Sequence, residues 1–164
     1  MSNDQKIKDR LGEIYEEVMW LAHRSHVSPS AARAWYTHVA SNSIKRYIRM
    51  FSGKVSLLAL NPDETLRLEH FKRMQTTLTK LVDRHVLKGA YDKNEFIRAV
   101  LDCEQVHIVT LQENYAAMKA DGNYQKAGIS LVAWSSIPSE QKVFLWRKML
   151  RGKVANADKF KPDE

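Results

Sequence analysis

The sequence predicts an all-α fold, a helical bundle of about five or six helices that contains one long antiparallel helix hairpin. Apolar residues recur at spacings of three and four along most of the chain, which is typical of helices with one buried face. Caps and glycine stops divide these stretches into separate helices. The chain has 164 residues, of which 44% are hydrophobic and 27% charged, and this suits one globular core. We therefore expect a single helical domain over residues 1–151.

The N-terminal part divides into a first helix and a bent helical region. Residues 7–21 carry one apolar stripe, which predicts a helix from about residue 3 to residue 26. Ser28, Pro29 and Ser30 then supply a break and a new N-cap. Beyond them, the apolar residues before and after residue 41 fall on different helical faces. We therefore expect two short helices, 30–39 and 42–52, with a bend near residues 40–42.

The longest predicted feature is a helix hairpin over residues 62–88 and 93–120. Pro62 suits the first position of a helix, Gly89 stops it, and Asp92 with Glu95 forms a capping box for the second helix. Both helices carry apolar stripes, so they are expected to pack along their length. Glu104 falls on the second stripe, which predicts a buried carboxylate bonded to the facing helix.

Two apolar segments and a last helix complete the predicted fold. Residues 54–60 and 128–134 are each compatible with a short strand, so the sequence allows one minor two-strand pairing within the helical fold. A last helix is expected to begin near Pro138. Residues 152–164 lack apolar periodicity, which predicts a mobile C-terminal tail.

Positive charge is the main clue to function. The formal net charge is +7 and the pI is near 9.5, which favours nucleic acid or another acidic partner. The charge is unevenly spread, because residues 28–60 carry five Lys or Arg residues and no Asp or Glu. This acid-free stretch is the first candidate for a binding surface.

Residues 30–50 resemble the helix-turn-helix segment of DNA-binding proteins. The residues that carry the resemblance are Ala34, Val39, the Ser-Asn-Ser sequence at 41–43, Ile44 and Tyr47. It implies a second helix with one face docked on its neighbour and a cationic face toward DNA. The predicted nucleic-acid-binding residues are Asn42, Lys45, Arg46, Arg49 and Lys54. The function predicted is that of a basic DNA-binding protein, such as a regulator or mobile-element accessory protein, with DNA preferred to RNA. Reading paired half-sites would require a homodimer.

Two other functions stay open at this point. A helical protein–protein interaction module would use the same basic surface to meet an acidic partner. The segment from Arg33 to His38 resembles the Arg-x4-6-His pattern of HEPN ribonucleases. That resemblance implies a histidine that assists RNA cleavage and an arginine that stabilises phosphate charge. An enzyme is the less favoured class, and we assign no catalytic residue.

The sequence predicts no metal, cofactor or membrane partner. Glu104 and His107 have the Glu-x-x-His spacing of di-metal helical bundles, but the chain has no second such pair. Cys103 is the single cysteine, so an intramolecular disulfide is excluded. No stretch reads as a signal-peptide core or a bilayer-spanning helix. We therefore expect a cytoplasmic protein.

Overall fold

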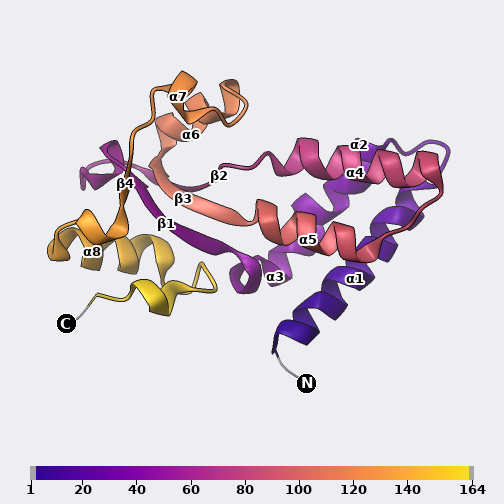
Figure 1. Ribbon diagram of the computed structural model, residues 1–164, viewed down its shortest axis with the longest axis horizontal. Coiled ribbons are helices and arrows are strands. Elements are labelled where there is room, and N and C mark those ends of the chain that lie inside the picture. The colour runs from indigo at the N-terminus through magenta and orange to yellow at the C-terminus, as the bar shows by residue number, and fades with distance from the viewer. Residues whose placement is uncertain (1–2, 163–164) are drawn as a thin grey trace. The chain divides into compact units, whose positions relative to one another are not determined.

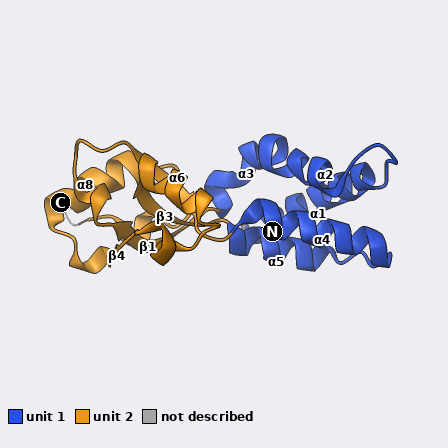
Figure 2. Ribbon diagram, turned by 90° about the horizontal axis from the view of Figure 1, so that it is seen from above, with its two compact units in different colours: residues 1–48, 73–103 blue, residues 49–72, 104–164 orange. Residues whose placement is uncertain are grey.

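The computed structural model describes residues 3–162 and contains two compact units. Unit 1 comprises residues 1–48 and 73–103, and unit 2 comprises residues 49–72 and 104–164 (Figure 2). Each unit is therefore assembled from two stretches of chain that are separated in the sequence.

Unit 1 is helical (Figure 1). Its helices are α1 (Asn3–Ala22), α2 (Pro29–Trp35), α3 (Ser41–Ile48), α4 (Met74–Lys88) and α5 (Lys93–Cys103). Each helix contributes buried apolar side chains to one core, among them Leu11, Ala32, Ile44, Leu78 and Phe96. The predicted first helix is confirmed, and Gly89 ends α4 with a φ of 60°, a backbone conformation that a residue without Cβ adopts readily.

A π-helix, Tyr36–Ala40, joins α2 to α3 without a turn. The buried apolar residues of this region recur every four positions, at Ala32, Tyr36, Ala40, Ile44 and Ile48. Because an α-helix has 3.6 residues per turn, a repeat of four drifts by about 40° at each step. The wider π-helical turn offsets this drift and keeps the five side chains on one face. The two separate helices predicted on either side of residues 40–42 are therefore one continuous helical stretch.

Unit 2 is built on a four-stranded mixed sheet with the order β2-β3-β1-β4. Its strands are β1 (Met50–Ser56), β2 (Leu66–His70), β3 (Gln105–Thr110) and β4 (Leu131–Ala133). Strand β3 runs parallel to β1 and antiparallel to β2, while β4 runs antiparallel to β1. The pairing of β1 with β4 is the minor two-strand pairing that the sequence allowed. The two strands β2 and β3 were not predicted.

Helices lie on both faces of this sheet (Figure 1). One face is associated with α6 (Leu111–Lys119) and α7 (Tyr124–Ala127), and the other with α8 (Ser139–Leu145). A π-helix, Trp146–Leu150, continues α8, and 3-10 turns occupy Leu58–Leu60, Trp134–Ser136 and Ala157–Phe160. The α8 face holds the apolar core of the unit, in which Val55 and Ile108 of the sheet pack with Leu145 and Leu150.

The all-α prediction is wrong because β2 replaces the beginning of the first predicted hairpin helix and β3 interrupts the second. Within the predicted hairpin over 62–88 and 93–120, the helices are α4, α5 and α6. Pro62 does not open a helix, and Asn61 before it accepts a hydrogen bond from the backbone N–H of Asp63 in a turn. Strand β3 was missed because Ile108 and Leu111 continue the spacings of three and four that begin at Ile97 in α5, so the segment matches a helical stripe as well as a strand.

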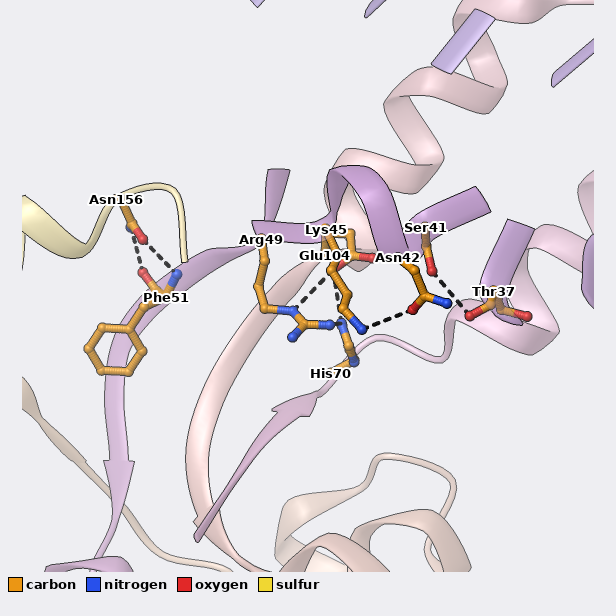
Figure 3. Close-up of polar contacts among 9 residues, drawn as sticks. All are labelled: Thr37, Ser41, Asn42, Lys45, Arg49, Phe51, His70, Glu104 and Asn156. Atoms are coloured by element: carbon orange, nitrogen blue, oxygen red, sulfur yellow. Dashed lines mark hydrogen bonds and ion pairs between the residues drawn. The ribbon is translucent and has the colours of Figure 1, made fainter. Parts of the chain in front are cut away.

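The chain after Gly152 packs against unit 2 as far as it is described. Asn156 accepts a hydrogen bond from the Phe51 backbone N–H and donates one to the Phe51 carbonyl, both at 2.9 Å (Figure 3). The Phe160 ring lies edge-on to Phe51, with ring centroids 4.7 Å apart. The side-chain amide of Asn156 therefore bonds the Phe51 backbone as a neighbouring strand would at the beginning of β1. Residues 163–164 of the predicted tail lie outside the described residues.

We predict that Asn156→Ala lowers the free energy of unfolding by about 1–3 kcal/mol, because it leaves both backbone groups of the buried Phe51 without their partner. Urea unfolding followed by tryptophan fluorescence would measure the change. Asn156→Asp should also destabilise, since a carboxylate cannot donate to the Phe51 carbonyl. The control is Asn94→Ala, an exposed position in α5, and equal effects at the two sites would contradict the prediction.

Candidate functional site

The five residues predicted to bind nucleic acid do not lie on one recognition helix. Asn42, Lys45 and Arg46 belong to α3 in unit 1, whereas Arg49 and Lys54 belong to unit 2. The helix-turn-helix interpretation is wrong because residues 29–48 form an uninterrupted helical stretch with no turn. The DNA-binding prediction loses the motif on which it rested.

The three predicted residues of α3 form contacts within their own helix. The Lys45 ammonium donates to the Asn42 side-chain oxygen at 3.0 Å (Figure 3). The Asn42 amide donates to the His38 carbonyl. The Arg46 guanidinium lies over the Tyr47 ring, 4.6 Å from its centroid. These are the contacts of a solvated helix face.

The Arg33 guanidinium is buried, although the resemblance to HEPN ribonucleases would require it to meet phosphate. Its nitrogens donate to three side-chain hydroxyls, those of Ser30, Thr37 and Thr79. Burial lowers the pKa of Arg33. Because only 7% of Arg33 is exposed, its role in the described structure is to satisfy polar groups among the helices of unit 1.

A buried carboxylate in unit 2 brings together three strand ends. Glu104, which directly precedes β3, is 2% exposed. Its Oε2 lies 3.0 Å from His70 Nε2 at the end of β2 and 3.4 Å from Arg49 Nε at the beginning of β1 (Figure 3). The Glu104 carbonyl also accepts a hydrogen bond from the Met50 N–H, 3.0 Å away. Glu104 is thus buried as predicted, but its partners are Arg49 and His70 rather than a facing helix.

Arg49 also lines a cleft of about 580 Å³ that lies within unit 2. The other cations on the lining are Arg67, Lys148 and Lys153. Two acids, Asp63 and Glu64, share it. Cations therefore outnumber acids, and the one cation that is held by a buried carboxylate is Arg49. We take this cleft, with Glu104 and His70 behind Arg49, as the candidate functional site.

A second polar cluster lies on the opposite face of the same sheet. Glu69 and His107 are directly opposite each other on β2 and β3. Ser52 hydrogen-bonds to His107 Nδ1 at 2.5 Å, and the Tyr124 hydroxyl donates to Glu69. The Phe71 ring stacks on His107 with centroids 4.2 Å apart. Burial, with a smaller effect of the Lys54 charge, lowers the pKa of His107 to about 4.

The predicted Glu-x-x-His spacing does not create a metal site. Successive side chains of a strand point to opposite faces, so Glu104 and His107 are directed to different sides of the sheet. No group of three or more His, Cys, Asp or Glu side chains within residues 3–162 could hold a metal ion. Residues three apart share one face only on a helix, so the Glu-x-x-His spacing would bring Glu104 and His107 together only there.

Sequence reasoning identified Arg49 and Glu104 but missed Arg67, His70, Lys148 and Lys153. The missed residues come to Arg49 through strand pairing and through the packing of α8 and its continuation. The sequence offered one signal for Lys148 and Lys153, namely that the C-terminal region is basic. The sequence pattern nevertheless assigns these two residues to a core helix and a mobile tail.

No protein-family model, curated protein sequence or solved structure matches this chain. Among the described helices, none combines the length and apolarity needed to cross a bilayer.

We predict that His107 makes folding less favourable in mild acid. Its folded-state pKa of about 4 lies below the ordinary value of 6.5, so between these values the unfolded chain binds more protons. The His107 contribution to stability is full above pH 6.5, falls as the pH drops toward 4, and is constant below pH 4.

Chemical denaturation between pH 4 and pH 7 would measure this dependence. His107→Gln should flatten the pH profile of the unfolding free energy relative to wild type, since glutamine does not titrate. His26→Gln, at an exposed position, is the control and should leave the slope unchanged. Parallel profiles for wild type and His107→Gln would show that His107 is not the titrating group.

Proposed function

We propose that the protein binds the phosphodiester backbone of a nucleic acid in the cationic cleft of unit 2. The single observation that carries the proposal is the arrangement of Arg49, which the buried Glu104 orients at a cleft shared with three other cations. The proposal keeps nucleic acid as the class of partner and replaces the helix-turn-helix mode with backbone contacts from unit 2.

Arg49 is suited to hold a phosphate. The Arg49 Nε donates to the Glu104 carboxylate, and the Arg49 Nη2 lies 3.5 Å from His70 Nε2. The Nη1 group has no protein partner among the described residues. A planar guanidinium with one edge fixed by a carboxylate offers its remaining N–H groups in a defined direction, which is the geometry of phosphate recognition by arginine. Because Glu104 fixes the side chain beforehand, binding would cost less side-chain entropy.

The other cations would extend this contact along a chain of phosphates. Lys148 and Lys153 are exposed, and the Lys153 ammonium donates to the Lys148 carbonyl at 2.8 Å. Arg67 donates to the Leu66 carbonyl, at 3.0 Å. Contacts of this kind neutralise phosphates without reading bases, so the proposed binding is largely independent of sequence.

We predict that the double variant Lys148→Gln, Lys153→Gln weakens nucleic-acid binding and makes it less dependent on salt. The slope of log affinity against log salt should become shallower by about 0.7–0.9 for each phosphate that the variant no longer neutralises. Fluorescence anisotropy with a labelled 20-nucleotide single-stranded RNA and a DNA duplex, over a salt series, would measure both effects. Both lysines are exposed, so folding should be unaffected.

The matched control is Lys45→Gln, Arg46→Gln, which removes the same charge from α3 in unit 1. It should leave the affinity and the salt slope close to wild type. A larger decrease in affinity for this control than for the unit 2 variant would contradict the proposed site. No binding of either nucleic acid at low salt would contradict the function itself and would favour an acidic protein as the partner.

A further inference from the structure

Unit 1 carries a groove in which acidic side chains outnumber cations, whereas cations outnumber acids in the cleft of unit 2. It has a volume of about 690 Å³ and runs along α1, with Trp35 at the end of α2 on its wall. Its acidic residues are Glu13, Glu16 and Glu17, against the single cation Arg10. Trp20 and Trp35 supply the aromatic surface. Trp20 is 60% exposed and Trp35 is 37% exposed. We call these residues the acidic–aromatic groove.

The two tryptophans are held in place by polar contacts rather than by burial. Trp35 Nε1 donates to a Glu17 carboxylate oxygen at 2.8 Å. The Arg24 guanidinium lies over the Trp20 ring, 3.9 Å from its centroid. Exposed aromatic side chains that are already oriented lose little conformational entropy on binding, which is the property of interface hot spots. The Arg24 contact also indicates that the Trp20 ring accepts a guanidinium.

The acids of the groove are paired only weakly within the protein. Arg10 lies 2.9 Å from Glu13 and 3.8 Å from Glu17, and Lys93 lies 3.5 Å from Glu16. The side chains in these pairs are 42–70% exposed, and ion pairs at such positions contribute little to stability. A partner's cations could therefore replace these intramolecular pairs at small cost.

We propose that the acidic–aromatic groove binds a basic amphipathic helix of a partner protein. Charge complementarity identifies the occupant: three carboxylates attract lysine and arginine, whereas they repel the phosphates of nucleic acid. The tryptophans supply both an apolar surface and cation–π acceptors for the same side chains. From Arg10 to Leu21 the groove follows α1 for roughly 16 Å, which matches about three turns of a docked helix. This inference uses no residue of the cationic cleft and is independent of the proposed function.

A defined peptide tests the proposal on the full-length protein. The probe is a fluorescein-labelled 18-residue peptide. Its leucines recur at the spacing i, i+3, i+4 and i+7, which forms one apolar helix face, and its other residues are arginine or lysine. A peptide of the same composition with the leucines scrambled keeps the charge and removes the apolar face. We expect the patterned peptide to bind at least tenfold more tightly than the scrambled one in an anisotropy titration.

Variants of the groove should separate the aromatic from the ionic contribution. Trp20→Ala should weaken binding of the patterned peptide roughly tenfold or more, as loss of a hot-spot tryptophan does. The double variant Glu13→Gln, Glu16→Gln should weaken it and reduce its salt dependence, while Glu17 stays to hold Trp35. All three positions are exposed, and circular dichroism would verify that the variants fold. The controls Leu87→Ala and Asp83→Asn, at exposed positions of α4 outside the groove, should bind as wild type does.

Three results would overturn the proposal. Equal binding of the patterned and scrambled peptides would reduce the groove to a nonspecific acidic surface. Unchanged affinity in Trp20→Ala would exclude the groove as the binding site. Sedimentation velocity that shows a dimer of the wild-type protein, dissociated by Trp20→Ala, would identify a second copy of this chain as the occupant instead.

Discussion

The buried carboxylate of Glu104 is the constraint on which unit 2 depends. A carboxylate that is 2% exposed is costly unless it is paired and hydrogen-bonded. The partners that satisfy it, Arg49 and His70, lie at the ends of two other strands. Satisfying one charge therefore brings the beginning of β1, the end of β2 and the beginning of β3 to one place. The hydrogen bond from the Met50 N–H to the Glu104 carbonyl begins the parallel pairing of β1 with β3 at the same point.

The same constraint explains why Arg49 differs from the predicted binding residues of α3. Among the described residues, Asn42, Lys45 and Arg46 contact only their own helical stretch, so they can change conformation at little cost. Arg49 is fixed by a carboxylate that cannot move to solvent. The sequence pattern placed the four residues on one polar helix face, whereas the structure distinguishes them by what holds each side chain. Preorganisation, rather than charge, therefore selects Arg49 as the centre of the candidate site.

Unit 1 was largely predictable from the sequence and unit 2 largely was not. The helices α1, α4 and α5 each bury one face, so their apolar residues carry the helical period into the sequence. Strand β3 is almost wholly buried, and its apolar residues continue the helical spacing of α5, so the helical period extends past the point where the helix ends. The pairing of β1 with β4 was allowed because both segments are short and apolar. In the site, Arg49 and Glu104 stood out by charge and position, but His70, Lys148 and Lys153 join them only through tertiary pairing.

The π-helix shows how a correct observation from the sequence led to a wrong structure. The apolar residues on either side of residue 41 are out of phase for a straight α-helix, and a bend was one way to bring both faces to one core. The protein instead widens a single turn, so that residues four apart stay aligned and the helix continues. A phase shift in an apolar pattern therefore indicates either a break between two helices or a π-helical turn within one continuous helix. Exposure of Trp35 and Val39 decides between them here, because a bent segment would have buried both.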